Sequence, residues 1–79
     1  MIRIHLSRLM GERRLKIAEV ARETGIGRNA LARLYYEQAE RVDLETLEKL
    51  CRFLNVGISD LLELTEDEGS TTPRRNDRG

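Results

Sequence analysis

The sequence predicts a small all-α domain of five helices. Its 79 residues are 39% hydrophobic and 35% charged, which suits one domain that buries roughly 60% of the surface of its unfolded chain. With two Tyr, one Phe and no Trp, the core must come from Leu, Ile, Val and Ala, a composition typical of packed helices. Apolar residues also recur at three- and four-residue intervals, as in amphipathic helices.

The composition argues against several classes of function. Cys51 is the single Cys and His5 the single His, so a disulfide, a structural zinc site and a Cys/His nucleophile pair are not expected. We also find no paired carboxylates or phosphate-binding glycine loop, and we expect no catalytic activity and no cofactor or metal. No apolar run reaches the roughly 18 residues that span a bilayer, and no secretory signal is recognisable, so we expect a cytoplasmic protein.

The N-terminal segment predicts a helix over about residues 5–13. Leu6 and Leu9 mark its apolar stripe. Ahead of the helix, Ile2 and Ile4 alternate with charged residues, a period of two that is consistent with a short strand. The pattern does not decide whether such a strand pairs within the chain or between molecules.

Two short helices follow, over about residues 17–24 and 28–36. Gly25 stands where the first of them needs a residue that tolerates positive φ. Leu31 and Leu34 give the second its inward edge. Only a tight glycine-containing turn separates the two helices.

The fourth helix, over about residues 44–54, has the clearest apolar face of the chain. Asp43 stands at its N-cap position. Its outer face carries two pairs in which an acidic residue stands four positions before a basic one, and this order stabilises a helix. These pairs are Glu45 with Lys49 and Glu48 with Arg52.

A short fifth helix is expected to end in Leu61, Leu62 and Leu64. From Thr65 onward the chain has no apolar side chain to bury and cannot offset its ordering entropy. We therefore expect one ordered domain over residues 1–64 and a disordered polar tail over residues 65–79.

The second and third helices have the features of a helix-turn-helix unit. Ala21 is a small residue where the helices cross, Gly25 lies in the turn, and Leu31 and Leu34 anchor the second helix. In this stretch, over residues 17–34, the sequence resembles the Xre/Cro-like family of phage and bacterial repressors. The segments from Leu44 to Val56 and from Ile58 to Leu62 are similar to that family's fourth helix and closing turn.

The resemblance covers about residues 5–64 and implies a lambda-repressor-like fold. It also implies sequence-specific binding of a double-stranded DNA operator by a homodimeric transcriptional regulator, a repressor, located in a bacterial or phage-infected cytoplasm and on the nucleoid when bound. The sequence departs from the family at Lys16 and Ile17, where the family has a Ser or Thr cap followed by Gln. It departs again at Tyr35-Tyr36-Glu37, where an acidic residue and Gly are usual.

One face of the third helix has the chemistry for reading DNA. At about 100° per residue, a set of five positions falls within an arc of about 140°, opposite Leu31 and Leu34. Arg donates two hydrogen bonds to guanine, Asn pairs with adenine, and Ala allows close approach. The resemblance implies that Arg28, Asn29 and Arg33 read bases. The outward positions are Arg28, Asn29, Ala32, Arg33 and Tyr36.

Backbone contacts are expected around this face. Gly27 leaves the N-terminus of the third helix open to a phosphate, and Lys16 does the same for the second helix. The resemblance places Arg41, in the following loop, at a backbone contact. Arg33 has a structural alternative, an ion pair with Glu37 four residues on. For the outward Asn and Tyr of the third helix, the alternatives are helix capping and simple packing.

Charge is unevenly distributed along the neutral chain. Residues 1–41 hold nine Lys or Arg against five acidic residues, whereas residues 42–68 hold two against eight. This leaves open a second function, a protein-interaction module such as an antitoxin or adaptor that binds a partner through its acidic C-terminal half. Two apolar groups are candidate dimer surfaces: the Ile2 and Ile4 segment, and the end formed by Leu61, Leu62 and Leu64.

Overall fold

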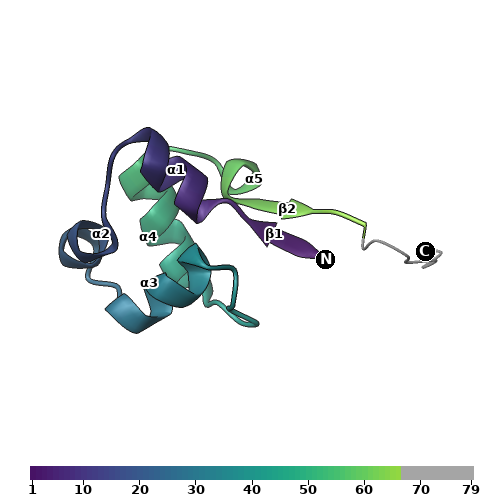
Figure 1. Cartoon of the computed structure of the whole chain (residues 1–79), viewed down its shortest axis with the longest axis horizontal. Coiled ribbons are helices and arrows are strands. Elements are labelled where there is room, and N and C mark those ends of the chain that lie inside the picture. The colour runs from purple at the N-terminus through teal and green to yellow at the C-terminus, as the bar shows by residue number, and fades with distance from the viewer. Residues whose placement is uncertain (67–79) are drawn as a thin grey trace.

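The computed structural model describes residues 1–66 and contains five helices and two short strands (Figure 1). The five helices and the N-terminal strand confirm the predicted fold class. Four of the helices lie within one residue of their expected bounds, or match them. The elements are β1 (Ile2–Ile4), α1 (Leu6–Glu12), α2 (Ile17–Thr24), α3 (Arg28–Tyr35), α4 (Leu44–Leu54), α5 (Ile58–Leu61) and β2 (Leu62–Leu64).

A single apolar core joins all five helices. Each helix contributes at least one side chain that solvent does not reach, so the apolar stripes found from the sequence period converge on one centre. α2 packs on α3 and α4, and α1 packs on α3. The fully buried side chains are Leu6, Met10, Val20, Leu31, Leu50, Leu54 and Leu61.

The helix α4 matches its predicted bounds and its predicted ion pairs. Lys49 lies 3.5 Å from Glu45, and Arg52 lies 2.9 Å from Glu48, measured between nitrogen and oxygen. Asp43 has the extended backbone of an N-cap residue, but its carboxylate accepts a hydrogen bond from the Thr46 hydroxyl. That hydrogen bond holds the pKa of Asp43 below its ordinary value.

The helix α3 ends at Tyr35, one residue before its predicted end. Glu37 follows with a φ of 57°, in the left-handed region. The Gln38 amide donates to the Arg33 carbonyl at 2.7 Å, and the Glu37 amide donates to the Leu34 carbonyl at 3.2 Å. These two bonds close the helix with the left-handed turn that glycine usually supplies.

The segment Leu62–Leu64 is a strand, so the prediction that it ends the fifth helix is wrong. α5 is a single turn, because Leu62 leaves the helical region and β1 offers the segment a hydrogen-bonded edge. The two strands pair antiparallel. The register joins Ile2 with Leu64, Arg3 with Glu63, and Ile4 with Leu62.

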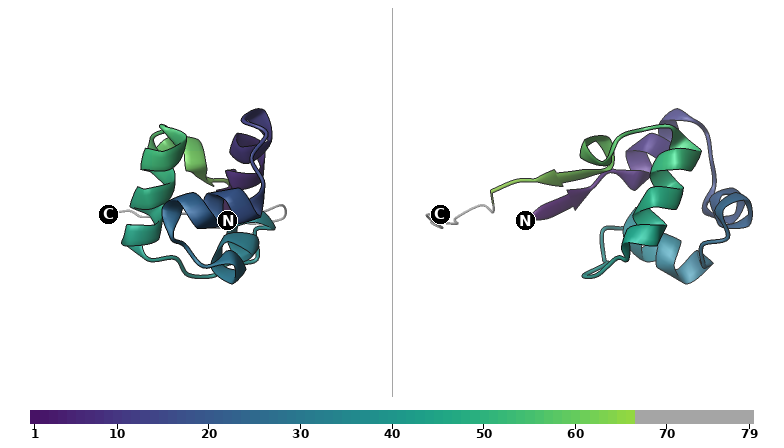
Figure 2. Two further views of the ribbon diagram at one scale, coloured as in Figure 1. Left: turned by 90° about the vertical axis from the view of Figure 1, so that its left-hand side faces the viewer. Right: turned by 180° about the vertical axis from the view of Figure 1, so that it is seen from behind.

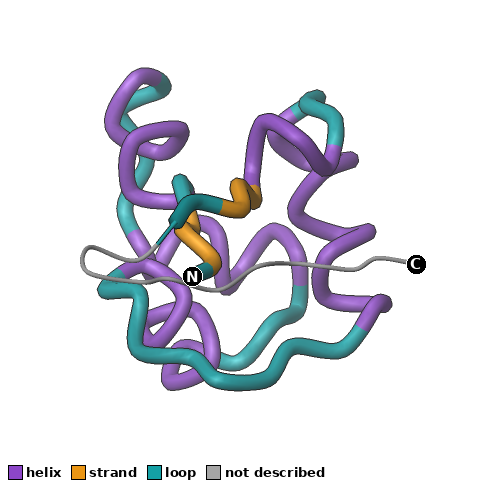
Figure 3. Tube along the Cα trace, turned by 90° about the vertical axis from the view of Figure 1, so that its right-hand side faces the viewer, coloured by secondary structure: helices purple, strands orange, loops and turns teal. Residues whose placement is uncertain are grey.

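The two apolar groups considered separately as dimer surfaces therefore pair with each other. Ile4 and Leu61 are buried in the core, while Ile2 and Leu64 are 55% and 77% exposed. The β1–β2 ribbon projects from the helical body at the end away from α2 (Figures 1 and 2). Figure 3 looks towards the end of this ribbon, with its two strands near the centre of the view.

Hydrogen bonding continues one residue beyond the strands. The Met1 amino group donates to the Thr65 carbonyl at 2.9 Å, and the Thr65 amide donates to the Met1 carbonyl at 2.8 Å. Thr65, assigned above to the polar tail, thus extends the ladder. The rest of the predicted tail, from residue 67 on, lies outside the described residues.

Candidate nucleic-acid interface

The turn between α2 and α3 is held by hydrogen bonds and by one buried side chain. Gly25 has a φ of 79°, and its amide donates to the Ala21 carbonyl at 2.9 Å. The Thr24 hydroxyl donates to the Val20 carbonyl at 2.6 Å and accepts from the Ile26 amide at 3.2 Å. Ile26 itself is buried. The turn therefore fixes the angle between the two helices.

The core fixes which face of α3 meets solvent. Leu31 is 0% and Leu34 is 3% exposed. On the opposite arc, the described side chains are exposed, apart from a half-buried alanine at the centre of the face. Tyr36 packs edge-on against the half-buried Tyr35, with ring centroids 4.9 Å apart. The exposed set is Arg28, Asn29, Arg33 and Tyr36, with Ala32 half-buried.

The N-termini of α2 and α3 are exposed to solvent, and neither has a side-chain cap. Gly27 is the N-cap residue of α3, and no side chain accepts a hydrogen bond there. Lys16 is the N-cap residue of α2, where its amide donates to the Glu19 carboxylate at 2.9 Å. Ile17, which stands where the family has Gln, packs half-buried against the core. Because Ile17 is apolar, the side chain of Lys16 replaces the family's Gln as the polar group at the N-terminus of α2.

Ion pairing divides the Lys and Arg side chains of residues 1–66 into two groups. In the first group, each lies 2.8 to 3.7 Å from a carboxylate. In the second, no side chain has an ion pair or hydrogen bond within residues 1–66. The first group is Arg3, Arg8, Arg13, Arg22, Lys49 and Arg52. The second group, the unpaired cations, is Arg14, Lys16, Arg28, Arg33 and Arg41.

Arg33 is unpaired because its expected partner bonds elsewhere. The Glu37 carboxylate accepts from Arg3 Nε at 2.8 Å, from Arg3 Nη2 at 3.1 Å, and from the Ile4 amide at 3.1 Å. The Arg3 guanidinium is the main reason why the pKa of Glu37 is lowered to about 2. The suggested pair with Arg33 is wrong, since Glu37 lies past the helix end in the left-handed region.

Arg14 is an unpaired cation that the sequence analysis missed. It lies in the loop between α1 and α2, two residues before Lys16, and is exposed. Its φ of 57° closes α1 in the way that Glu37 closes α3. The sequence held no signal that marks it, since Arg3, Arg13 and Arg22 also lack an acidic residue four positions away and yet are ion-paired.

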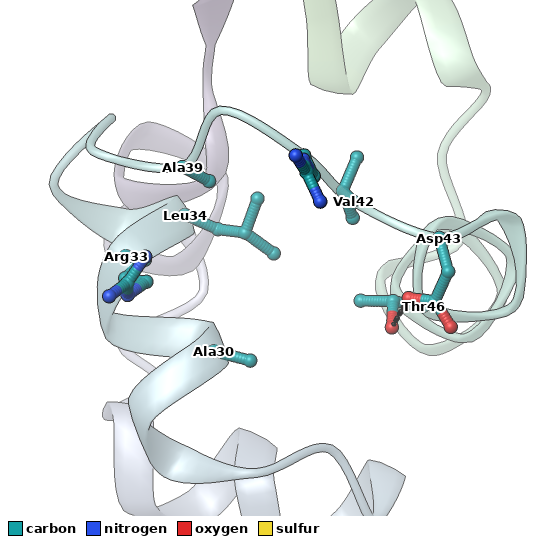
Figure 4. Close-up of a pocket in the computed structure, with 8 residues that line it drawn as sticks. Ala30, Arg33, Leu34, Ala39, Val42, Asp43 and Thr46 are labelled. Carbon is teal, nitrogen blue, oxygen red and sulfur yellow. Dashed lines mark hydrogen bonds between the residues drawn. The ribbon is translucent and has the colours of Figure 1, made fainter.

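A hollow on one side of α3 is bordered by two of the unpaired cations (Figure 4). It lies between α3 and the start of α4. Leu34, Ala39 and Val42 line its apolar wall, and Arg33 and Arg41 border it. The structure thus brings together two predicted site residues that are eight positions apart in the sequence.

A second hollow lies on the side of α3 that faces α2. Lys16 and Arg28 border it, together with Tyr36. The exposed face of α3 therefore stands between two hollows, each with a pair of unpaired cations. This arrangement suits a helix that enters the major groove while its flanks approach the phosphates on either side.

A comparison with protein families matches residues 5–67 to the Cro/C1-type HTH DNA-binding domain. The chain belongs to this family. Membership confirms the resemblance to Xre/Cro-like regulators and identifies the Cro/C1-type chain, in general terms, as a DNA-binding transcriptional regulator with a helix-turn-helix. Neither a curated protein nor a solved structure gives a significant match.

Two further findings concern the described part of this Cro/C1-type chain. None of its helices has the length and apolar character needed to cross a bilayer. Residues 1–66 contain no group of three or more His, Cys, Asp or Glu side chains placed to hold a metal ion. Domains of this family are typically not enzymes.

Proposed function

We propose that the chain is a sequence-specific repressor that binds a double-stranded DNA operator as a homodimer in a bacterial or phage-infected cytoplasm. In this proposal, α3 lies in the major groove, and Arg28, Asn29 and Arg33 read base edges. Ala32 lets the helix backbone approach the bases, and Tyr36 contacts the edge of the groove. Each well-formed bidentate contact discriminates by roughly 1–3 kcal/mol.

The surrounding cations would bind the sugar-phosphate backbone. Lys16 and Arg14 approach the strand on the α2 side, and Arg41 approaches the strand on the α4 side. Gly27 leaves the N-terminal amides of α3 free to meet a phosphate. These contacts position the helix without reading sequence.

One observation supports the proposal above the others: the unpaired cations gather around α2 and α3. On α4, by contrast, Lys49 and Arg52 each pair with a glutamate four residues earlier. A carboxylate beside a cation offsets the positive potential that attracts a phosphate, so a paired cation is the weaker phosphate ligand. An unpaired cation releases counterions into solution when it binds DNA.

Two-fold symmetry is part of the proposal because one domain of this size makes few base contacts. Two copies that read half-sites about one helical turn apart double the number of contacts. The operator would then be an inverted repeat.

Selection from random duplex DNA at near-physiological salt tests the proposal. We expect the purified chain to enrich an inverted repeat. Enrichment of an unpaired half-site would refute the homodimer. No enrichment would refute sequence-specific binding and favour the interaction module, in which the acidic C-terminal half binds a partner protein.

A further inference from the structure

The β1–β2 ribbon has two outer edges, which differ in the hydrogen-bond partners of their backbone groups. Cross-strand backbone hydrogen bonds join Met1 with Thr65, and the His5 amide donates to the Leu61 carbonyl at 2.8 Å. In an antiparallel ladder, hydrogen-bonded pairs alternate with non-bonded pairs. The pairs Ile2–Leu64 and Ile4–Leu62 are therefore the non-bonded ones, and their backbone groups point away from the ribbon.

The outer edge of β1 is closed at Ile4. The Ile4 amide, which points outward, donates to the Glu37 carboxylate at 3.1 Å. The same carboxylate holds the Arg3 guanidinium beside this edge. A second strand could not pair at Ile4 without displacing Glu37, so only Ile2 offers outward backbone groups at this edge.

The outer edge of β2 is open at Leu64. The Leu62 amide is used by α5, since it donates to the Ile58 carbonyl. Within residues 1–66, however, the Leu62 carbonyl and both backbone groups of Leu64 have no hydrogen-bond partner. An unpaired edge of this kind is a template for another strand.

We propose that β2 pairs antiparallel with β2 of a second copy, centred on Leu64, so that two ribbons form one four-stranded sheet in the homodimer. The two Leu64 residues exchange both of their backbone hydrogen bonds, and the Glu66 amide of each copy donates to the Leu62 carbonyl of the other. This inference deepens the homodimer of the proposed function and rests on it for its biological role.

The side chains fit this register. Leu64 is 77% exposed and shares a face with Ile2, which is 55% exposed. Pairing at Leu64 brings these apolar residues of both copies into one row across the sheet, which removes their surface from water. The apolar face continues into a hollow lined by Ile4, Leu34 and Val42.

The charges also favour Leu64 as the centre. On the other face, Glu63 lies opposite the partner's Thr65, and within its own chain it already pairs with His5 at 2.8 Å. Centring on Glu63 would instead set two glutamates directly opposite each other, which destabilises a strand pair. Centring on Leu62 fails because its amide is already used.

A matched pair of proline variants of the full chain tests the edge. Leu64→Pro removes the outward amide of β2, and Ile2→Pro removes the corresponding outward amide of β1. Neither amide takes part in the β1–β2 ladder, and each substitution removes one exposed apolar side chain. By sedimentation equilibrium without DNA, we expect wild type and Ile2→Pro to be dimers, and Leu64→Pro to have half their mass. A dimeric Leu64→Pro variant, or a monomeric wild type, would overturn the inference.

Hydrogen exchange of the wild-type chain gives a test that does not depend on a variant folding. The Leu64 amide should exchange about tenfold more slowly once nine-tenths of the chains are paired, because exchange then proceeds through the unpaired tenth. The Ile2 amide should not respond to protein concentration in this way. Equal behaviour of the two amides would contradict pairing at β2.

Duplex binding separates this inference from the proposed function. If wild type dimerises through β2 but enriches no DNA sequence, the function is wrong and the interface stands. If wild type enriches an inverted repeat while Leu64→Pro remains dimeric, the function stands and the interface is wrong.

Discussion

Replacing Lys16 by Ala should flatten the salt dependence of DNA binding. Lys16 lies at the N-terminus of α2, with a side chain that has no ion pair or hydrogen bond within residues 1–66. Cations that bind phosphates release condensed counterions, so the slope of log K against log salt reports how many phosphates are contacted. Removing an unpaired cation at the interface therefore changes this slope.

The size of the change follows from the number of unpaired cations. Arg14, Lys16 and Arg41 in each copy give six phosphate contacts in a dimer, for a slope of about −5. Lys16→Ala removes two of them and should make the slope shallower by about 2. Between 50 and 200 mM salt, affinity should then fall about 10²-fold in the variant, against about 10³-fold in the wild type.

Fluorescence anisotropy with the selected operator across a potassium chloride series measures the slope. Lys49→Ala is the matched control, because Lys49 already pairs with Glu45 at 3.5 Å on α4. Its slope should equal that of the wild type. An unchanged slope in Lys16→Ala, or equal flattening in both variants, would refute the assignment of unpaired cations to phosphates.

Further predictions concern specificity, stability and pH. Arg28→Ala should cost roughly 1–3 kcal/mol of operator affinity and relax preference at one base pair, as measured by repeated selection, whereas Arg52→Ala should change neither. Leu50→Ala should lower the free energy of unfolding, measured in urea, by about 2–5 kcal/mol, since Leu50 is 0% exposed. Leu44→Ala, on the same helix but 80% exposed, should change it by less than about 0.5 kcal/mol. Equal losses in the two variants would contradict the placement of Leu50 in the core. Because the pKa of Glu37 is lowered to about 2, its contribution to stability is complete above its unfolded pKa near 4.5 and is lost as pH falls towards 2. Thermal melting of Glu37→Gln should therefore show a weaker pH dependence than wild type between these values, and identical profiles would exclude a stabilising role for the carboxylate.

The helices were predictable because their determinants are local. The apolar stripe of α4 and its pairs Glu45–Lys49 and Glu48–Arg52 depend on residues three or four positions apart, and these are neighbours on any helix. The outward face of α3 followed in the same way from the burial of Leu31 and Leu34. Such features require no knowledge of the rest of the chain.

The sequence was less able to predict which cations of the site have an ion-pair partner. The sequence placed Arg33 within reach of Glu37 and gave no reason to look for Arg3, which is 34 positions away from that glutamate. Which cations remain unpaired depends on such distant partners. Arg14 was overlooked because no helical period covers a loop residue.

The sequence by itself determined where the helices lie, which of their faces form the core and which family the fold resembles, because periodicity and spacing are properties of short segments. The tertiary structure alone decided that Leu62–Leu64 is a strand, that Glu37 binds the outward amide of Ile4 at one edge of the ribbon, and that the other edge is open at Leu64. A three-residue strand has no stable partner within its own segment, so its conformation is set by a strand 60 residues away in the chain. Long-range pairing of this kind is fixed only when the helices between the two strands have packed.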